Sequence, residues 1–339
     1  TAVVVSLEAD ETRALLQEVP SAYRTRIDEV LLTALGLALA EWTGDRVQVV
    51  DLEGHGREEL FEDVDVSRTV GWFTTLYPVG LEAPDTDAGW STWIKSVKEQ
   101  LRGVPRRGIG YGVLRWLGQG ETSRQLGAVA GPELSFNYLG RFDAGSLGSG
   151  NLRLLSDGGG WSQWPGDERS HVLAVNAAVG STGELEIGFT YSTALHDRST
   201  VEGLAGSYLS SVEALLDHCL DPASFGVTAS DFPWSGLAGA SLDALVDREV
   251  EDVYALTALQ SGMLFHGLYA PERGDYVEQV SCRVSGAGFD AGAFRRAWEG
   301  VVGRHGVLRT RFAWSDLESP VQLVQRSVAL EWHEQDWRG

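Results

Sequence analysis

Residues 27–58 decide the fold, and their sequence is IDEVLLTALGLALAEWTGDRVQVVDLEGHGRE. In residues 27–42 the apolar side chains recur every three or four positions, which is the spacing of a helix that packs on one face. Thr43 and Gly44 end this helix. Residues 47–52 are rich in β-branched side chains and predict a strand. A helix followed directly by a strand indicates an α/β layered fold.

Segments of the same two kinds flank this stretch. We expect a helix that is capped by Asp10 and ended by Pro20, because an aspartate can accept hydrogen bonds from the amides of a first turn. Residues 172–179 and 184–191 predict a β-hairpin that turns at 180–183. The other expected elements are strands at 3–7, 134–138 and 307–312 and helices at 93–101, 113–117, 200–219, 237–246 and 289–304. Because strands and helices alternate, an α/β sandwich is favoured over an all-β fold.

The length of 339 residues fits two domains, or one and a half. Between about residues 221 and 252 the chain becomes polar and rich in Pro, Ser, Gly and acidic residues, which is typical of a domain boundary. We therefore expect a first domain at 1–220, an interdomain linker at 221–252 and a second domain at 253–339.

The composition excludes several classes of function. The formal net charge of −21 argues against a nucleic-acid groove and against anionic membrane surfaces. The apolar runs are much shorter than the ~20 residues that span a bilayer. The chain has two cysteines, Cys219 and Cys282, which favour a reducing cytoplasm over a disulfide framework. The seven histidines lack metal-ligand spacing, and a Gly-x-Ser-x-Gly nucleophile elbow is absent, so neither a metal site nor a serine hydrolase is expected.

The sharpest local feature is EGHGRE at 53–58, directly after the expected strand. Glycines on both sides of His55 allow a tight turn and a close approach to another group. Glu53, beside a ring and the guanidinium of Arg57, fits a general acid or base whose strength is set by its surroundings. The alternative is a glycine-rich turn in which these polar residues pair with one another.

Three further segments have two interpretations each. Residues 68–78, which include Trp72, either line a channel for an extended substrate or form a core strand with its turn. The glycine-rich segment 108–112 lacks the ending of a phosphate-binding loop, so we expect a flexible turn before the helix at 113–117. Asn137 and Tyr138 are neighbours in a strand and point to opposite faces, so one of them can reach a cavity; the alternative is sheet packing.

Five segments together resemble the epimerization domains of nonribosomal peptide synthetases, in the order in which that family has them. Residues 28–36 are similar to its DxLLxAxG helix, and 53–58 match its EGHGRE. Residues 68–78 match RTVGWFTxxYP, 105–112 are similar to PxxGxGYG, and 136–140 match FNYLG. The resemblance covers roughly residues 1–220.

The chain after the boundary resembles the start of a condensation domain of the type that accepts a D-configured donor. Residues 254–266 are similar to YPLSPLQEGMLFH, and 304–310 are similar to RHExLRT. The sequence departs from these patterns at Ala255, Ala258, Ser261 and Gly306.

The resemblance implies a fold of chloramphenicol-acetyltransferase-like α/β lobes with the active site in a tunnel between two lobes. The family signature HHxxxDG is not found in these 339 residues. We expect it before Thr1 for the first domain and after Gly339 for the second. We therefore expect the chain to be the C-terminal portion of an epimerization domain joined to the N-terminal portion of a condensation domain, and to be inactive by itself.

The resemblance assigns removal of the substrate α-proton to Glu53, and we expect this carboxylate to be partly withdrawn from water, which strengthens a base. Asn137 and Tyr138 are the candidates for further catalytic, site-shaping groups. The residues expected to have structural or site-shaping roles are His55, Arg57, Trp72, Tyr111 and Arg309. Arg309 is expected to pair with the aspartate of HHxxxDG.

The substrate would arrive on the 4'-phosphopantetheine arm of a peptidyl carrier domain, so no directly bound cofactor is expected. The implied partners are carrier, adenylation and condensation domains of the same assembly line, in the cytoplasm. Two alternatives remain: a non-catalytic module that docks carrier domains, and a condensation-type acyltransferase.

Overall fold

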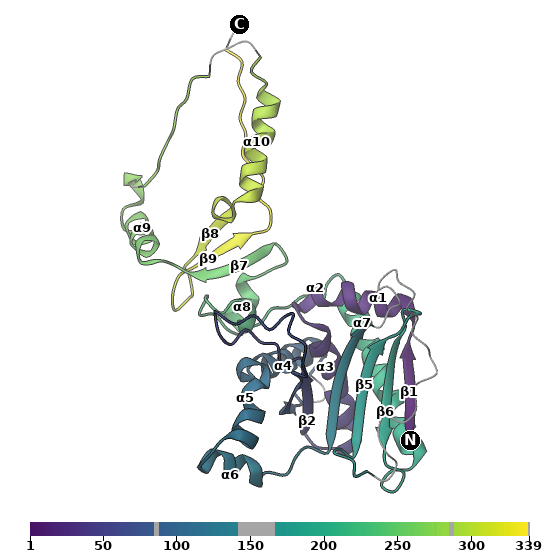
Figure 1. Ribbon diagram of the computed structural model, residues 1–339. Coiled ribbons are helices and arrows are strands. Elements are labelled where there is room, and N and C mark those ends of the chain that lie inside the picture. The colour runs from purple at the N-terminus through teal and green to yellow at the C-terminus, as the bar shows by residue number, and fades with distance from the viewer. Residues whose placement is uncertain (85–87, 142–166, 275, 285–287, 338–339) are drawn as a thin grey trace. The chain divides into compact units, whose positions relative to one another are not determined.

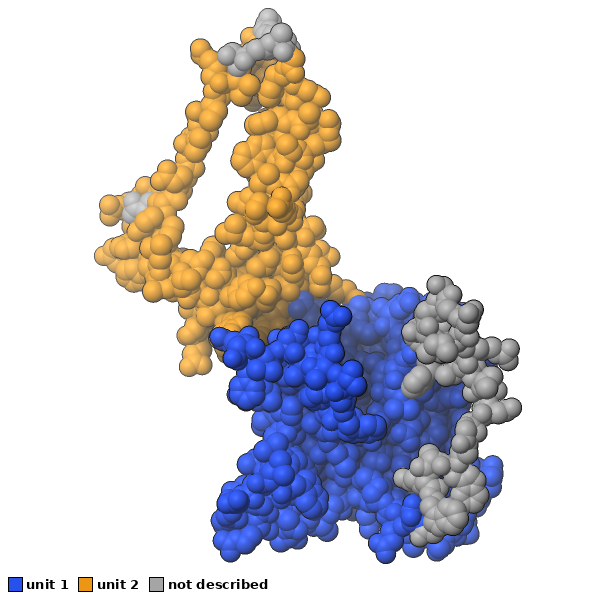
Figure 2. Space-filling view, viewed as in Figure 1, with its two compact units in different colours: residues 1–226 blue, residues 227–339 orange. Residues whose placement is uncertain are grey.

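The structure is a computed structural model that describes residues 1–84, 88–141, 167–274, 276–284 and 288–337. These residues form two compact units, 1–226 and 227–339, which Figure 2 distinguishes by colour. Each unit contains its own β-sheet.

Unit 1 is built on a six-stranded sheet with the strand order β1-β6-β5-β4-β2-β3 (Figure 1). The strands are β1 (Ala2–Leu7), β2 (Val47–Gly54), β3 (Thr75–Glu82), β4 (Leu134–Arg141), β5 (Leu173–Val179) and β6 (Leu185–Tyr191). β2, β4 and β5 run parallel to one another, whereas β1, β3 and β6 each pair antiparallel with their neighbours. The three parallel strands therefore end at the same edge of the sheet.

Helices cover one face of this sheet. The long helices α3 (Ile27–Thr43) and α7 (Arg198–Leu220) are tied together by the Tyr208 hydroxyl, which donates to the Leu31 carbonyl at 3.2 Å. Leu52 of β2 and Phe136 of β4 belong to the same buried core as these helices. Because side chains alternate along a strand, the residues next to them face the opposite side of the sheet. The other helices are α1 (Ala9–Gln17), α2 (Val19–Tyr23), α4 (Trp90–Arg102), α5 (Ile109–Gly112) and α6 (Glu121–Ala128).

The helix expected from Asp10 to Pro20 is in fact two helices. α1 starts after Glu8, whose backbone amide donates to Glu11 Oε2 at 3.3 Å. Asp10 lies inside the first turn and pairs with Arg13 at 2.9 Å, so it is not the cap. Pro20 lies in the first turn of α2, where the amide hydrogen that proline lacks would have no helical partner.

Two glycine-containing segments also differ from expectation. Residues 68–74 do not form a strand: β3 begins at Thr75, and Val70 is fully exposed. The core-strand interpretation of 68–78 is therefore wrong for its first part. The expected flexible turn at 108–112 is helical instead, because a 3-10 turn (Pro105–Gly108), α5 and a π-helical turn (Val113–Leu117) follow one another.

Unit 2 contains a three-stranded antiparallel sheet with the order β7-β9-β8, formed by β7 (Val250–Ala255), β8 (Thr310–Ala313) and β9 (Val321–Gln325). Its helices are α8 (Ala240–Leu245), α9 (Ala258–Tyr269) and α10 (Ala291–Arg304). The Thr257 side chain caps α9, and Asp290 Oδ1 caps α10 by accepting from the Ala293 amide at 3.0 Å. Of the strand expected at 307–312, the first residues form a 3-10 turn (Gly306–Arg309).

No helix in the described part of the chain is both long enough and apolar enough to cross a membrane.

Candidate active site

A cavity of about 610 Å³ lies in unit 1, where β2 and β4 end and α3 begins. Residues from four segments line it, at 26–32, 52–58, 72–77 and 136–139, together with Leu101 and Arg107. Five residues singled out from the sequence are among them: Glu53, His55, Trp72, Asn137 and Tyr138. The other two from this unit, Arg57 and Tyr111, are not lining residues.

Glu53 and Asn137 are brought together by the register of two parallel strands. Leu52 of β2 lies opposite Phe136 of β4, so the next residue on each strand points to the other face of the sheet, side by side. Asn137 Nδ2 donates to Glu53 Oε2 at 2.6 Å. In the described part of the chain no cation pairs with Glu53. The Glu53 carboxylate is therefore oriented by a neutral amide and not neutralised by a counter-ion.

The expected withdrawal of Glu53 from water is not found. The residue is exposed, because it projects from the end of β2 at the rim of the cavity. The described residues hold its carboxylate on one side only, through Asn137.

Two tyrosines line the cavity from the helix-covered side of the sheet. Tyr77 lies opposite Leu52 on β3, and Tyr138 follows Asn137 on β4. Burial raises the pKa of both phenols; the Asp28 carboxylate raises the pKa of Tyr77 further, while Arg26 and Arg107 oppose this. Neither hydroxyl has a hydrogen-bond partner among the described residues. Both phenols therefore stay protonated near neutral pH and present neutral groups to the cavity.

Most of the polar residues after Glu53 pair with one another. His55 Nε2 lies 3.3 Å from Glu58 Oε1, and Arg107 lies 3.7 Å from the same oxygen. Arg57 donates to the Val66 carbonyl, and its guanidinium lies 4.3 Å from the centre of the Phe73 ring. The glycine-rich-turn interpretation thus describes the contacts of His55 and Glu58, whereas the Arg57 side chain contacts residues 66–73 and Glu53 stays outside these ion pairs.

Gly56 is required by the shape of this turn. It has a φ of +65°, and a Cβ atom built on it would lie 1.6 Å from the Phe73 carbonyl oxygen. Only glycine fits here, because a side chain would need both a disfavoured backbone conformation and the space of another backbone. The close approach holds residues 53–58 against 73–75.

Trp72 and Tyr111 have different surroundings. Trp72 lines the cavity but is 90% exposed, so it stands at the entrance. The Tyr111 hydroxyl accepts from Arg115 at 2.5 Å, within the helical segment 109–117, and makes no contact with the cavity.

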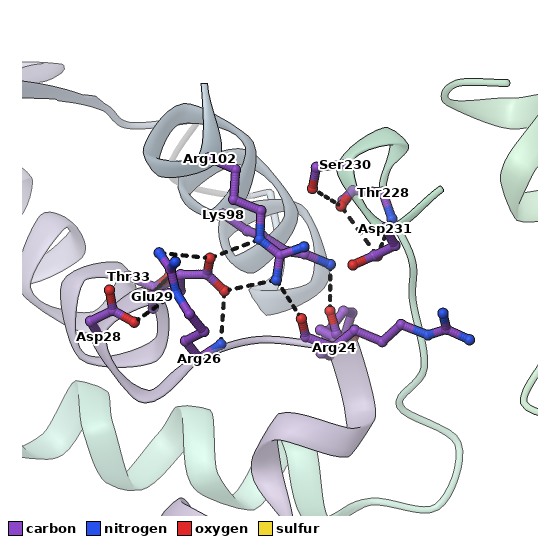
Figure 3. A network of polar contacts seen from close by, with 11 residues as sticks. Arg24, Arg26, Asp28, Glu29, Thr33, Lys98, Arg102, Thr228, Ser230 and Asp231 are labelled. Atoms are coloured by element: carbon purple, nitrogen blue, oxygen red, sulfur yellow. Dashed lines mark hydrogen bonds and ion pairs between the residues drawn. The ribbon is translucent and has the colours of Figure 1, made fainter. Parts of the chain in front are cut away.

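A buried ionic network holds the start of α3, which forms one wall of the cavity (Figure 3). Glu29 is fully buried; its carboxylate accepts from Arg102 Nε at 2.8 Å and from the Arg26 amide at 2.8 Å. Arg102 also donates to the Arg24 carbonyl at 2.6 Å, and Lys98 Nζ donates to the Tyr23 carbonyl at 2.6 Å. The two cations of α4 thus satisfy carbonyls at the end of α2 and fix the corner between α2 and α3.

Sequence reasoning missed Tyr77, Asp28 and Arg107 as cavity residues. All three lie inside segments that the family resemblance had marked, at 28–36, 68–78 and 105–112. The position of these residues inside the motifs was the signal that could have marked them. The local sequence pattern does not show which side chains of a motif face the cavity. Among the described residues, no group of three or more His, Cys, Asp or Glu is arranged to hold a metal ion.

Arg309 lies in unit 2 and is buried. Its guanidinium pairs with Glu251 at 2.9 Å and donates to the Val302, Gln325 and Arg326 carbonyls. It thus ties the 3-10 turn to β7, α10 and β9. Its expected pairing with an aspartate of HHxxxDG involves a motif that this chain does not contain.

We predict that Arg309→Ala lowers the free energy of unfolding of unit 2 by about 1.5–3 kcal/mol, because buried carbonyls lose a charged donor. Urea unfolding of the chain, followed by the fluorescence of its tryptophans, measures this. Arg304→Ala at the end of α10 is the matched control, and equal effects of both substitutions would contradict the structural role.

Comparisons with known proteins show which family the chain belongs to. A family model described as "Condensation domain" matches residues 2–233 and 250–339. Two linear gramicidin synthase proteins of Brevibacillus parabrevis are similar in sequence. One is 46% identical over 340 residues, which cover 99% of this chain and 6% of that protein. The other is 44% identical over 339 residues, which cover 99% of this chain and 4% of that protein. The chain therefore spans only a small part of the length of these relatives.

One solved structure is similar in both fold and sequence. It is the epimerization domain from the third module of tyrocidine synthetase B, with a TM-score of 0.60 and 37% identity, covering 65% of this chain and 48% of that one. This likeness confirms the expected α/β fold class of chloramphenicol-acetyltransferase-like lobes. With a family model that matches nearly all of its length, the chain belongs to the condensation-domain family of nonribosomal peptide synthetases.

Proposed function

We propose that unit 1 is the C-terminal portion of an epimerization domain and that Glu53 removes the α-proton of an aminoacyl or peptidyl thioester carried on 4'-phosphopantetheine. In this reaction the α-carbon–hydrogen bond breaks, the proton moves to the Glu53 carboxylate, and the electron pair spreads onto the thioester oxygen. A second donor, which we assign to a histidine of HHxxxDG outside this chain, returns a proton to the opposite face. The epimerization portion would then cover residues 1–220, the linker 221–252 and the condensation portion 253–339. The D-configured product would pass to the condensation domain.

The observation that carries this proposal is the pairing of Glu53 with Asn137. A carboxylate that acts as a general base must be ionised and within reach of the proton, and a paired cation weakens it by lowering its pKa. The Asn137 amide orients one carboxylate oxygen at 2.6 Å and leaves the other one available to the substrate. The carboxylates nearby are engaged differently, since Glu58 pairs with His55 and Asp28 pairs with Arg26. Among these three, Glu53 is the carboxylate suited to accept a proton.

The negative charge that develops on the thioester oxygen needs a neutral donor. A donor aimed at such an oxygen is worth about 3–4 kcal/mol. Tyr138 has a hydroxyl without a partner in the described residues, and burial keeps it protonated by raising its pKa. We assign it this role, while the Asn137 amide is occupied by Glu53.

The test is α-proton exchange in the synthetase that carries this chain, with the carrier loaded with its aminoacyl group in deuterated water. Glu53→Gln keeps the size of the side chain and removes the base, so we expect deuterium uptake to fall by at least about a hundredfold. Glu59→Gln is the matched control, because it removes an exposed carboxylate of the same loop outside the cavity, and it should exchange at the wild-type rate.

Deuterium uptake at the wild-type rate in Glu53→Gln would refute the proposal. Peptide-bond formation by unit 1 itself, without α-proton exchange, would instead favour the condensation-type acyltransferase, with which the family match is also compatible.

A further inference from the structure

Behind Glu53, the cavity continues on the helix-covered side of the sheet. Leu32, Leu52, Leu101 and Phe136 line it there, and each of them is buried in the core. The cavity therefore reaches past the strand ends into apolar surroundings. Its two sides differ in chemistry: Glu53 and Asn137 face one way, and the apolar side chains face the other.

The charged groups around this inner part are already paired. Arg26 lies 3.2 Å from Asp28 and 3.3 Å from Glu29. Glu58 is held by His55 and Arg107. An anionic group that entered here would be withdrawn from water where the lining cations are already paired, and such burial costs several kcal/mol.

The remaining wall groups are neutral. The hydroxyls of Tyr77 and Tyr138 have no partner among the described residues, and both phenols remain protonated because burial raises their pKa. The rings of these tyrosines offer apolar surface beside the leucines and Phe136, as binding sites for apolar groups do.

We propose that this inner part, formed by Ile27, Leu32, Leu52, Tyr77, Leu101 and Phe136, is a slot for the side chain of the amino acid being epimerized, and that it selects apolar side chains. This inference rests on the proposed function. It adds the substrate class: a carrier-bound aminoacyl group with an aliphatic or aromatic side chain, whose α-carbon is presented to Glu53 at the mouth of the slot. A cationic side chain is disfavoured for a different reason: the nearest carboxylate without a cation is Glu53, and pairing with it would weaken that base.

The test compares leucine, asparagine and aspartate, which have nearly the same shape and differ in polarity and charge. Each is loaded chemically onto the carrier of the intact synthetase, and α-proton exchange is followed in deuterated water. Each rate is divided by the rate for the same thioester in Glu53→Gln. This ratio removes the differences between the three substrates in the intrinsic acidity of the α-proton. We expect the normalised rate for leucine to exceed that for asparagine at least tenfold, and that for aspartate by more.

A substitution in the slot tests the same point independently. Ile27→Arg places a cation at the first position of α3, where the wild-type side chain is only partly buried, and should lower the leucine-to-aspartate ratio at least tenfold. Trp42→Arg, near the other end of α3 and outside the cavity, is the control and should leave the ratio unchanged.

The slot would be overturned if the three substrates gave equal normalised rates while Glu53→Gln still abolished exchange. The proposed function would remain in that case. The absence of enzymatic exchange for all three would overturn the proposed function. An unchanged ratio in Ile27→Arg with a wild-type unfolding midpoint would also contradict the slot.

Discussion

Arg102→Ala is expected to lower the free energy of unfolding by about 3 kcal/mol, because it leaves the fully buried Glu29 carboxylate without its main partner. The value lies at the lower end for broken buried ion pairs, since Arg26 still contacts Glu29 at 3.3 Å. The Arg24 carbonyl also loses its donor. Equilibrium unfolding of the chain in urea, followed by circular dichroism, measures the change.

Two further variants distinguish the effect of the ionic network on stability from the effect of losing a long side chain. Arg124→Ala removes an exposed arginine that pairs with Glu121, and it should cause no measurable change. The double variant Glu29→Met with Arg102→Met removes both charges and should recover a large part of the stability lost in Arg102→Ala. A double variant less stable than Arg102→Ala would show that the buried charges are not the cause.

Gly56→Ala is expected to slow α-proton exchange about a hundredfold and to destabilise unit 1 by about 2–6 kcal/mol, from the disfavoured backbone conformation and from overpacking together. A Cβ atom 1.6 Å from the Phe73 carbonyl oxygen forces the turn away from residues 73–75. The same movement displaces Glu53, and a misplacement of about 1 Å costs on the order of a hundredfold in rate. Deuterium uptake and urea unfolding are measured on the same preparation.

Gly110→Ala is the matched control for Gly56→Ala. Gly110 lies in α5, and a Cβ atom on it would have nothing within 4 Å. Alanine should therefore be tolerated there and even favour the helix. Wild-type exchange in Gly56→Ala would mean that the turn adapts without moving Glu53.

Long periodic segments were predictable from the sequence, and special local arrangements were not. The apolar stripe of α3 and the β5–β6 hairpin follow from side-chain spacing, because burial of one face requires that spacing. The cap of α1 was misplaced because Glu8 and Asp10 can both accept first-turn amides, and the choice depends on the path of β1 into the helix. The helix at 113–117 was expected, but the helical turns at 105–112 were missed because their glycines suggest a flexible turn.

The sequence marked five of the residues that line the candidate site, but it missed Tyr77, Asp28 and Arg107 and did not reveal the contacts. The motifs marked Glu53, Asn137 and Tyr138, and strand alternation placed the last two on opposite faces. The pairing of Glu53 with Asn137 depends on β2 lying next to β4, which no local pattern reveals. The exposure of Glu53 was also unpredictable, because it depends on what stands beside the end of β2 in three dimensions.

The neighbourhood of β2 and β4 leaves little tolerance for error in assembling the sheet. Sliding β4 by one position along β2 would exchange the amide beside the Glu53 carboxylate for an aromatic ring, either Phe136 or Tyr138, and would turn every side chain of that strand to the other face. The hydrophobic contacts that fix the alignment of the two strands are thus the same ones that put the Glu53 carboxylate next to the Asn137 amide. A substitution that shifts the packing between these two strands would therefore also separate the Glu53 carboxylate from the Asn137 amide.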